Sequence, residues 1–394
     1  MPIPDQDVIN AIIARVFSVT DITLGDTGSD FILRYRGQLL TDSIEAFDRL
    51  TELLRPYGLM PLFRKGEDGG HVILLVAAMP DPKPSNYWIN IGLFFLTVIS
   101  VVYTGMGYTD PSHLAGVSDN TRLLWLSLIY GGIPFAVSLL GILLSHEFGH
   151  YLMTRHHKTA ATLPYFIPFP TLLGTMGAVI VWKQLPRNKR ILFDVGIAGP
   201  LAGLVVAIPV VLIGLLGSKT GPVLASDGGF IEGNSILYLL AKLAVFGQLL
   251  PSPASYGSLS PALYWLKYFF TGQPMPIGGT DVFISPVAMA GWAGLLVTSL
   301  NLIPVGQLDG GHVMYVLFGK KLKYAMPVIL VLMAILGFFW NGWWLWVVML
   351  LFLGRRSADP LDQITELDPG RRALAWFMIL VFIIVFIPVP LISF

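Results

Sequence analysis

The chain has 394 residues, of which 54% are hydrophobic and only 12% are charged, whereas an ordinary soluble domain has roughly 25% charged residues. The 25 basic and 24 acidic residues leave a net charge of +1, so no overall charge points to a nucleic-acid partner. Cysteine is absent, which excludes disulfides, thiolate metal sites and a cysteine nucleophile. The composition indicates a multi-pass integral membrane protein with a mainly α-helical fold.

The first 80 residues have soluble patterning rather than a long apolar run. The stretches "DQDVINAIIARVF" and "DSIEAFDRLTELLRPYG" have helical spacing, and the second is closed by Pro56 and Gly58. "FILRYRGQLL" alternates as a strand does, and "MPLFRKGEDGGHVILLVAA" predicts a hairpin. Residues 1–80 therefore predict a small soluble α/β domain, residues 81–86 a proline-rich linker, and residues 87–394 a membrane-embedded domain.

Seven apolar segments follow the linker, on the criterion that about 20 residues cross the hydrocarbon core of a bilayer. They cover residues 87–105, 133–154, 191–216, 284–302, 324–340, 341–354 and 373–393. The run 235–250 is too short to span comfortably and carries Lys242, so we expect an interfacial or re-entrant helix there. The predicted fold is a bundle of about seven transmembrane helices.

The basic residues outside the N-terminal domain support this arrangement. A cytosolic N-terminus puts thirteen of them on the cytosolic side, namely Arg155, Lys158, Lys183, Arg187, Lys189, Arg190, Lys320, Lys321, Lys323, Arg355, Arg356, Arg371 and Arg372. Only Arg122, Lys219, Lys242 and Lys267 fall on the other side. Because cytosolic loops of membrane proteins are enriched in Lys and Arg, the sequence predicts a cytosolic N-terminus.

Residues 145–150 read "SHEFGH", which places an HExxH motif inside an otherwise apolar helix. At 3.6 residues per turn, His146 and His150 lie about 40° apart around the helix axis and about 6 Å apart along it, so both imidazoles can hold one zinc ion. Glu147 points beside the metal, where it can accept a proton from a bound water. Ionisable groups are costly at membrane depth, and this cost favours a functional site over a chance match.

A catalytic zinc site has three protein ligands and one open position, so a third ligand must come from elsewhere in the chain. The segment "VAMAGWAGLLVTSLNLIPVGQLDGGH" contains one acid, Asp309, and its Pro304, Gly306 and Gly310 predict a broken helix. Asp309 is the candidate third ligand, and a plain helix end at the cytosolic boundary is the alternative. The neighbouring His312 could support Asp309 or simply lie at the interface.

The pairing of HExxH with "NLIPVGQLDG" (residues 301–310) resembles the site-2 proteases, which are zinc metalloproteases that cleave within membranes. The stretches "GIPFAVSLLGILLSHEFGHYL" and "AVIVWKQLPRNKRILFDVGIAGPLAGL" are similar to the bacterial and chloroplast-type branch that lacks a PDZ domain. The resemblance covers about residues 130–315, which we take as the catalytic core.

The resemblance implies a set of site residues. His146, His150 and Asp309 would bind one zinc ion per chain, and Glu147 would be the base that activates water. Asn301 matches the leading asparagine of the family motif, which implies a role beside the substrate carbonyl or its oxyanion. An interhelical hydrogen bond is the alternative role for this buried amide.

Two further stretches resemble parts of the family fold. "YFIPFPTLLGTMGAVIVW" resembles a β-hairpin that re-enters the membrane, and Gly174–Val181 could offer a strand edge to an extended segment of the substrate. "AGP" at 198–200 matches a packing motif, for which close helix contact through small residues is the expected role.

The predicted function is intramembrane proteolysis: zinc-dependent hydrolysis of peptide bonds in or near the transmembrane segments of membrane-anchored substrates. We expect the chain in a bacterial plasma membrane, with a thylakoid or plastid membrane as the alternative. A metal-ion transporter or channel is one rival function, although it leaves Glu147 without a role. An inactive zinc-binding scaffold is the other, and it has no need of the intact HExxH glutamate. The sequence does not predict the oligomeric state.

Overall fold

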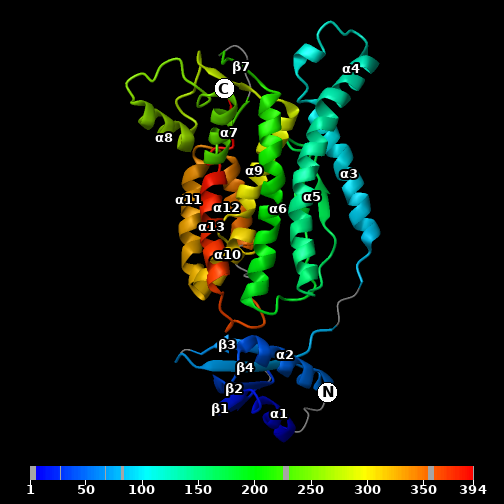
Figure 1. Cartoon of the computed structure of the whole chain (residues 1–394), viewed down its shortest axis with the longest axis vertical. Coiled ribbons are helices and arrows are strands. Elements are labelled where there is room, and N and C mark those ends of the chain that lie inside the picture. Colours follow the sequence, from blue (N-terminus) through cyan, green and yellow to red (C-terminus); the bar gives the residue numbers. More distant parts are fainter. Residues whose placement is uncertain are drawn as a thin grey trace.

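The structure, a computed structural model, describes residues 6–26, 28–66, 68–80, 84–224, 230–353 and 359–393, apart from the side chains of Lys320, Lys323 and Leu353. A small sheet unit lies at one end of a long bundle of helices (Figure 1). We call residues 6–80 the N-terminal unit and residues 84–393 the helical part. The end of the helical part that adjoins the N-terminal unit is its near face, and the opposite end is its far face. Residues 81–83 of the expected linker, and Arg355 and Arg356, lie outside the described residues.

The N-terminal unit is an antiparallel four-stranded sheet with two helices. Both helices, the strand in "FILRYRGQLL" and the hairpin were predicted from the sequence, whereas the strand over Phe17–Leu24 was not. Its elements are α1 (Gln6–Ile13), β1 (Phe17–Leu24), β2 (Leu33–Leu39), α2 (Ser43–Leu54), β3 (Leu59–Lys65) and β4 (His71–Ala77), with strand order β1-β2-β4-β3. The Asp42 side chain caps α2 by accepting a hydrogen bond from Ile44 N at 2.9 Å. Gly58 ends the following turn at φ +65°, a conformation that favours glycine.

A short extended segment near the end of the chain bridges to this sheet. Phe63 N of β3 donates to Leu361 O at 2.9 Å, and Gln363 N donates to Phe63 O at 3.1 Å, so residues 361–363 pair with the β3 edge in parallel. The other edge of the same segment is also bonded, because Asp362 N donates to Arg187 O at 2.7 Å. Ile364 is buried in the core of the N-terminal unit. The unit is therefore joined to the helical part by backbone pairing as well as by its linker.

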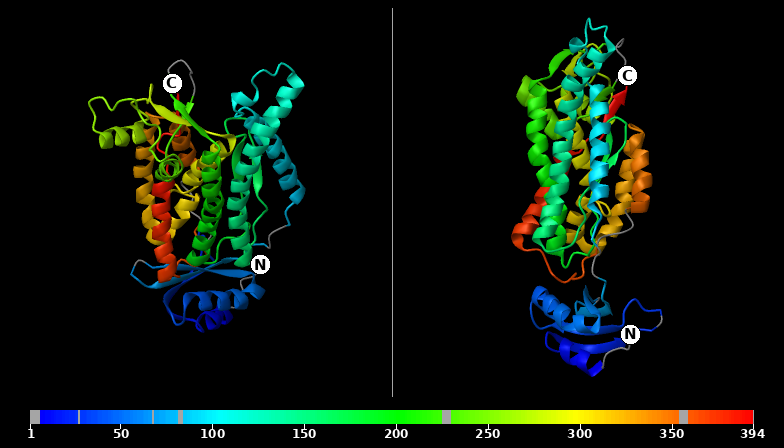
Figure 2. Two further views of the ribbon diagram at one scale, coloured as in Figure 1. Left: turned by 45° about the horizontal axis from the view of Figure 1, so that its top comes forward. Right: turned by 90° about the vertical axis from the view of Figure 1, so that its right-hand side faces the viewer.

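The helical part is built from helices of very different length that run side by side (Figures 1 and 2). They are α3 (Tyr87–Met106), α4 (Asn120–Ser127), α5 (Ile133–His156), α6 (Lys189–Leu216), α7 (Ile236–Phe246), α8 (Pro261–Thr271), α9 (Pro286–Asn301), α10 (Asp309–Phe318), α11 (Leu322–Gly337), α12 (Gly342–Leu353) and α13 (Pro369–Val385). Short strands join them: β5 (Tyr165–Pro168), β6 (Thr175–Val179), β7 (Lys219–Pro222), β8 (Phe230–Glu232), β9 (Thr280–Phe283) and β10 (Leu391–Ser393).

Three of the described helices are long and apolar enough to cross a membrane. They are α3, the continuous helix Asn120–His156 that includes α4 and α5, and α6. The helices α9, α11, α12 and α13 lie where the other predicted spans were expected but have only 12 to 17 residues. The protein is therefore mainly helical, with three long apolar helices, shorter ones beside them, and a terminal sheet.

One predicted boundary is wrong. The last apolar segment was expected to be helical over residues 373–393, whereas α13 begins at Pro369 and ends at Val385. Pro388 and Pro390 follow, and proline cannot continue a helix because it lacks the backbone donor. Residues Leu391–Ser393 instead pair with Phe230–Glu232 as a two-stranded sheet at the far face.

The β5–β6 hairpin lies along α3 for most of the length of that helix. Near the start of α3, the Asn90 amide donates to Leu163 O at 2.8 Å, and near its end, the Thr104 hydroxyl donates to Thr171 O at 3.1 Å. These two positions are fourteen residues apart, which is about 21 Å of helix. The hairpin thus starts at the near face and reaches deep between the long helices.

The run 235–250 forms α7, an eleven-residue helix that holds a buried cation. The Lys242 side chain is 0% exposed, and its ammonium lies 2.9 Å from a Glu232 carboxylate oxygen and 3.6 Å from one of Asp281. The Tyr238 hydroxyl also donates to Glu232, at 3.0 Å. Burial raises the pKa of the Asp281 carboxyl to about 6, against the opposing attraction of Lys242. One ammonium thus ties α7 to β8 and β9.

Removing this cation is expected to destabilise the fold strongly. In Lys242→Met the side chain keeps its length, but two buried carboxylates lose their partner, which typically costs about 3–5 kcal/mol. We expect a clearly lower unfolding temperature in detergent, partly restored by adding Asp281→Asn. Lys267→Met, at an exposed position on the neighbouring helix α8, is the matched control and should melt like the parent. Equal melting of the two variants would contradict the buried ion triad.

Candidate metal centre

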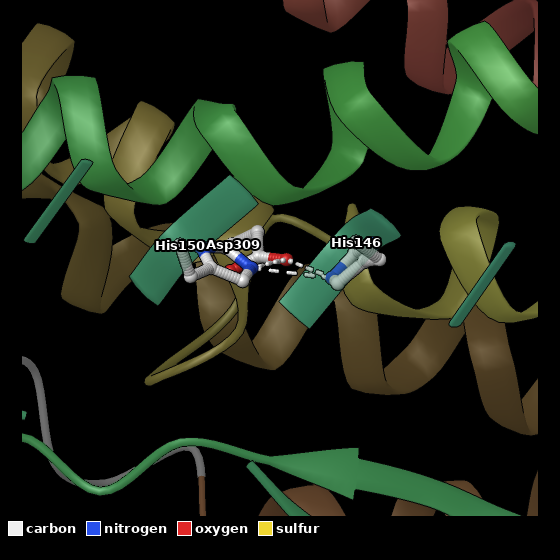
Figure 3. A group of neighbouring side chains, drawn as sticks. All are labelled: His146, His150 and Asp309. Atoms are coloured by element: carbon white, nitrogen blue, oxygen red, sulfur yellow. Dashed lines mark hydrogen bonds and ion pairs between the residues drawn. The ribbon is translucent and has the colours of Figure 1, made fainter. Parts of the chain in front are cut away.

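Helix α5 presents the HExxH motif on the side that faces α6 and α9. Its N-terminal half is apolar, and His146 and His150 lie one turn apart near its near-face end, with side chains only 4% and 11% exposed. The two imidazoles meet, since their Nε2 atoms are 3.2 Å apart (Figure 3). The α-helical spacing that the sequence predicts therefore brings both imidazoles to one point.

Asp309 reaches the same point from a broken helix. Helix α9 ends at Asn301, and α10 begins at Asp309 after a short turn, so the predicted break in this segment is confirmed. Gly306 adopts φ +59° in the turn, and a side chain on Gly310 would place its Cβ 1.9 Å from Leu302 O. Glycine at both positions lets the chain fold back sharply. The turn sets the Asp309 carboxylate at the N-terminus of α10, where the helix dipole favours an anion.

The three ligand candidates form a triangle of the size that a tetrahedral metal site needs. The Asp309 Oδ2 atom lies 3.3 Å from His146 Nε2 and 3.3 Å from His150 Nε2. For metal–ligand bonds of about 2.0 Å, two corners of a tetrahedron are about 3.3 Å apart. Among the residues that the structure describes, no other trio of His, Asp and Glu side chains comes this close. The donor set therefore fits one zinc ion.

A cavity of about 180 Å³ opens beside this triangle. Glu147 lines it and is 6% exposed, and Asn301 lines it with its amide nitrogen 3.3 Å from His146 Nε2. That contact joins α9 to α5, so the Asn301 amide makes an interhelical contact and also lines the cavity. His312 also lines the cavity, with its ring 6.1 Å from that of Trp182. Gln307 is a further lining amide. It lies inside "NLIPVGQLDG" but was not among the predicted site residues.

Small residues of α6 make room for the histidines. A Cβ at Gly199 would lie 2.0 Å from His150 Nε2, and one at Gly203 would lie 3.3 Å from the His146 side chain. Gly149 of α5 fits equally closely against Ala198 O, 2.4 Å from where its Cβ would be. The "AGP" stretch thus gives the close helix contact that was expected, and its glycine also clears the space that the His150 ring occupies.

The backbone of α6 orients His150. Val195 O accepts a hydrogen bond from His150 Nδ1 at 2.7 Å, which leaves Nε2 as the atom that faces Asp309 and His146. The preceding residue, Asp194, is held by two helices. Arg371 of α13 donates to both of its carboxylate oxygens at 2.7 Å, and His157 at the end of α5 lies 3.0 Å from it. No sequence pattern predicts this network, because its three residues come from distant segments.

Comparison with known proteins agrees with this site. The family model described as "Peptidase family M50" matches residues 134–338. The chain is 30% identical to "Probable zinc metalloprotease EGY1, chloroplastic" of Oryza sativa subsp. japonica over 98% of this chain and 68% of that protein. The chain belongs to peptidase family M50. Two relatives from Arabidopsis thaliana, the probable zinc metalloproteases EGY1 and EGY2, are 30% and 28% identical to this M50 chain.

Family membership confirms the predicted resemblance and the class of enzyme, a zinc metalloprotease. The matched residues 134–338 include the two histidines, the glutamate, Asn301 and Asp309. The M50 chain covers 56% and 50% of the two Arabidopsis relatives.

The Asp194 network yields a prediction for this M50 site. Asp194→Asn keeps the shape of the side chain but removes the charge that Arg371 and His157 share, so the α6 turn that orients His150 is held less firmly. Residues that support a metal ligand usually contribute about 10- to 100-fold in metal affinity or activity. We expect about a tenfold loss of zinc affinity, measured by competition with a chelator. Asp48→Asn, which removes an exposed carboxylate on the N-terminal unit, should leave the affinity unchanged.

Proposed function

We propose that the chain is an intramembrane zinc metalloprotease that cleaves membrane-anchored substrates in or near their transmembrane segments. The observation that carries this proposal is the triangle of His146, His150 and Asp309 with Glu147 beside it, all on or against a helix long enough to cross a membrane. His146 is ten residues from the end of α5, or about 15 Å. That depth supports a site inside the bilayer, nearer to the near face than to the other.

The side chains have separate roles in this proposal. His146, His150 and Asp309 would hold one zinc ion, which when bound would polarise the substrate carbonyl and lower the pKa of a water molecule towards about 7. Glu147 takes the proton from that water and passes it to the leaving amine. Asn301 lies beside the substrate carbonyl and donates a hydrogen bond to the oxygen as its negative charge develops.

The substrate is proposed to bind as an extended strand along β6. In the described part of the chain, β6 has a strand partner on one edge only, and Ala178, Val179 and Ile180 line the catalytic cavity. An unpaired edge can bind an extended peptide through backbone hydrogen bonds, within the stretch Gly174–Val181. A transmembrane helix must unwind to bind in this way, so substrate spans that contain glycine or proline should be favoured.

We further propose seven spans and a cytosolic N-terminal unit. The spans correspond to α3, α5, α6, α9, α11, α12 and α13, with the β5–β6 hairpin re-entering from the near face. Support comes from the basic residues, since Arg155, Lys183 and Arg371 belong to near-face segments, whereas Arg122 and Lys267 belong to α4 and α8 at the far face (Figure 1). The membrane is proposed to be a bacterial plasma membrane, with a plastid membrane as the alternative that the chloroplastic relatives favour.

A cleavage assay tests the proposal against its rivals. Purified protein in detergent is incubated with a reporter that has one glycine-rich span, with and without a zinc chelator. Proteolysis predicts cleavage that the chelator stops and that added zinc restores. A metal transporter predicts zinc flux into vesicles and no cleavage, and an inactive scaffold predicts neither. Flux without cleavage of any single-span reporter would overturn the proposal.

A further inference from the structure

A second cavity, of about 210 Å³, lies at the junction of the N-terminal unit and the helical part. The N-terminal unit contributes Arg55 and Met60 to its walls, and the helical part contributes Thr159, Lys183 and Arg187. The cavity is therefore present only because the two parts are docked together. No step of the proposed reaction uses it.

The ionisable side chains that line this cavity are all cationic: Arg55, Lys183 and Arg187. Among the described residues, the Asp48 carboxylate lies 3.5 Å from the Arg187 guanidinium, and both side chains of that pair are more than half exposed. Such exposed pairs neutralise each other weakly. A cleft whose walls carry one sign of charge concentrates ligands of the opposite sign. The cavity is therefore suited to an anionic group.

The cavity continues the route out of the catalytic site. Trp182 lines the catalytic cavity, and the next residue, Lys183, lines this one. The chain around Trp182 is extended and pairs with residues 160–162: Thr162 N donates to Val181 O at 3.0 Å, and Lys183 N donates to Ala160 O at 2.9 Å. A strand that adds to the cavity-facing edge at Ala178 and runs parallel to this segment reaches Lys183 after five residues, about 16 Å.

The two walls are held in register by backbone pairing. Residues 361–363 pair with β3 on one edge and with residues 186–188 on the other, and Asp362 N donates to the carbonyl of Arg187 itself. Lys65 of β3 and Arg190 of α6 both bond to Glu366, at 2.9 Å each. Arg187 is thus fixed relative to the N-terminal unit that carries Arg55.

We propose that this junction cavity binds an acidic segment that flanks the cleaved span of the substrate on the cytosolic side. The inference rests on the proposed function and names a substrate class for it. The cytosolic flanks of most membrane proteins are rich in Lys and Arg, so Arg55, Lys183 and Arg187 repel them. Repulsion of the common basic flanks and attraction of the rarer acidic flanks together give specificity. The N-terminal unit is then one wall of a substrate filter.

Reporters that differ only in the flank test this inference. Three single-span reporters carry four Asp, four Asn or four Lys residues after the cleaved segment on the cytosolic side. Exposed charge pairs contribute up to about 1 kcal/mol, so we expect KM for the Asp flank to be about three- to tenfold lower than for the Asn flank, with kcat nearly unchanged. High salt should remove the difference. The double variant Arg55→Glu/Lys183→Glu should prefer the Lys flank.

Matched controls make the outcome decisive. Lys267→Glu reverses an exposed charge on α8 at the far face and should keep the preference of the parent. Binding of the labelled reporters to Glu147→Gln is measured in parallel, so the flank preference can be read without cleavage. Equal KM and equal binding for all flanks would overturn the inference while leaving the proteolysis intact. The KM values are also measured in nanodiscs with and without phosphatidylglycerol. If KM depends on phosphatidylglycerol and not on the charge of the flank, the inference is overturned, because the cavity would then hold a lipid headgroup.

Discussion

Glu147→Gln is expected to keep the zinc ion and lose the cleavage of single-span reporters. The substitution preserves the size of the side chain and leaves His146, His150 and Asp309 untouched, so metal analysis should still find one zinc per chain. An amide cannot accept the proton of the attacking water, and general acid–base groups typically contribute about 10²- to 10⁴-fold in rate. We therefore expect kcat to fall by at least about 100-fold, measured with the glycine-rich reporter.

The control for this variant is Glu366→Gln, which removes an exposed carboxylate that pairs with Lys65 at 2.9 Å on the near side of the molecule. Its rate should stay within about twofold of the parent, because exposed ion pairs contribute little to stability. Full activity of Glu147→Gln would contradict the role of this residue as the base. Loss of zinc from the same variant would instead mean that Glu147 helps to bind the metal.

The metal triangle could be predicted from the sequence because two of its three ligands, His146 and His150, are only four residues apart. A four-residue spacing on a helix places His146 and His150 on one face whatever the rest of the fold does. Asp309 is 159 residues from His150, and what identified it was the broken-helix signature around it rather than any periodicity. Chemistry linked the two segments, since a zinc site with two histidines needs a third ligand.

Other features depend on contacts that no local pattern encodes. The pairing of residues 361–363 with β3 joins segments about 300 residues apart, and neither segment carries a sign of the other. Lys242 was expected at a membrane interface, whereas the structure buries it against Glu232 and Asp281. Its burial depends on two acids from separate strands. The end of α13 is different, because Pro388 and Pro390 are a local signal for a helix end, whereas the prediction followed the apolar run alone.

Gly199→Ala is expected to displace His150 and remove the zinc ion. The added Cβ would lie 2.0 Å from His150 Nε2, 2.4 Å from Cδ2 and 2.6 Å from Cε1, far inside contact distance. The His150 ring cannot turn aside freely, because its Nδ1 donates a hydrogen bond to Val195 O. Val195 lies on α6, one helical turn before Gly199. Either the ring leaves Val195 or α5 and α6 separate, and both break the triangle with Asp309. Cleavage should fall by more than about 100-fold, with zinc lost in proportion.

Two other glycine variants separate this effect from a general response to alanine. A Cβ at Gly141, on α5 itself, would meet nothing within 4 Å, so Gly141→Ala should keep zinc and activity and gain slightly in stability. A Cβ at Gly203 would lie 3.3 Å from His146, a contact that a small shift relieves, so an intermediate loss is expected. Zinc affinity should therefore be highest in Gly141→Ala, intermediate in Gly203→Ala and lowest in Gly199→Ala. Zinc binding by Gly199→Ala equal to that of Gly141→Ala would contradict the placement of His150 against α6.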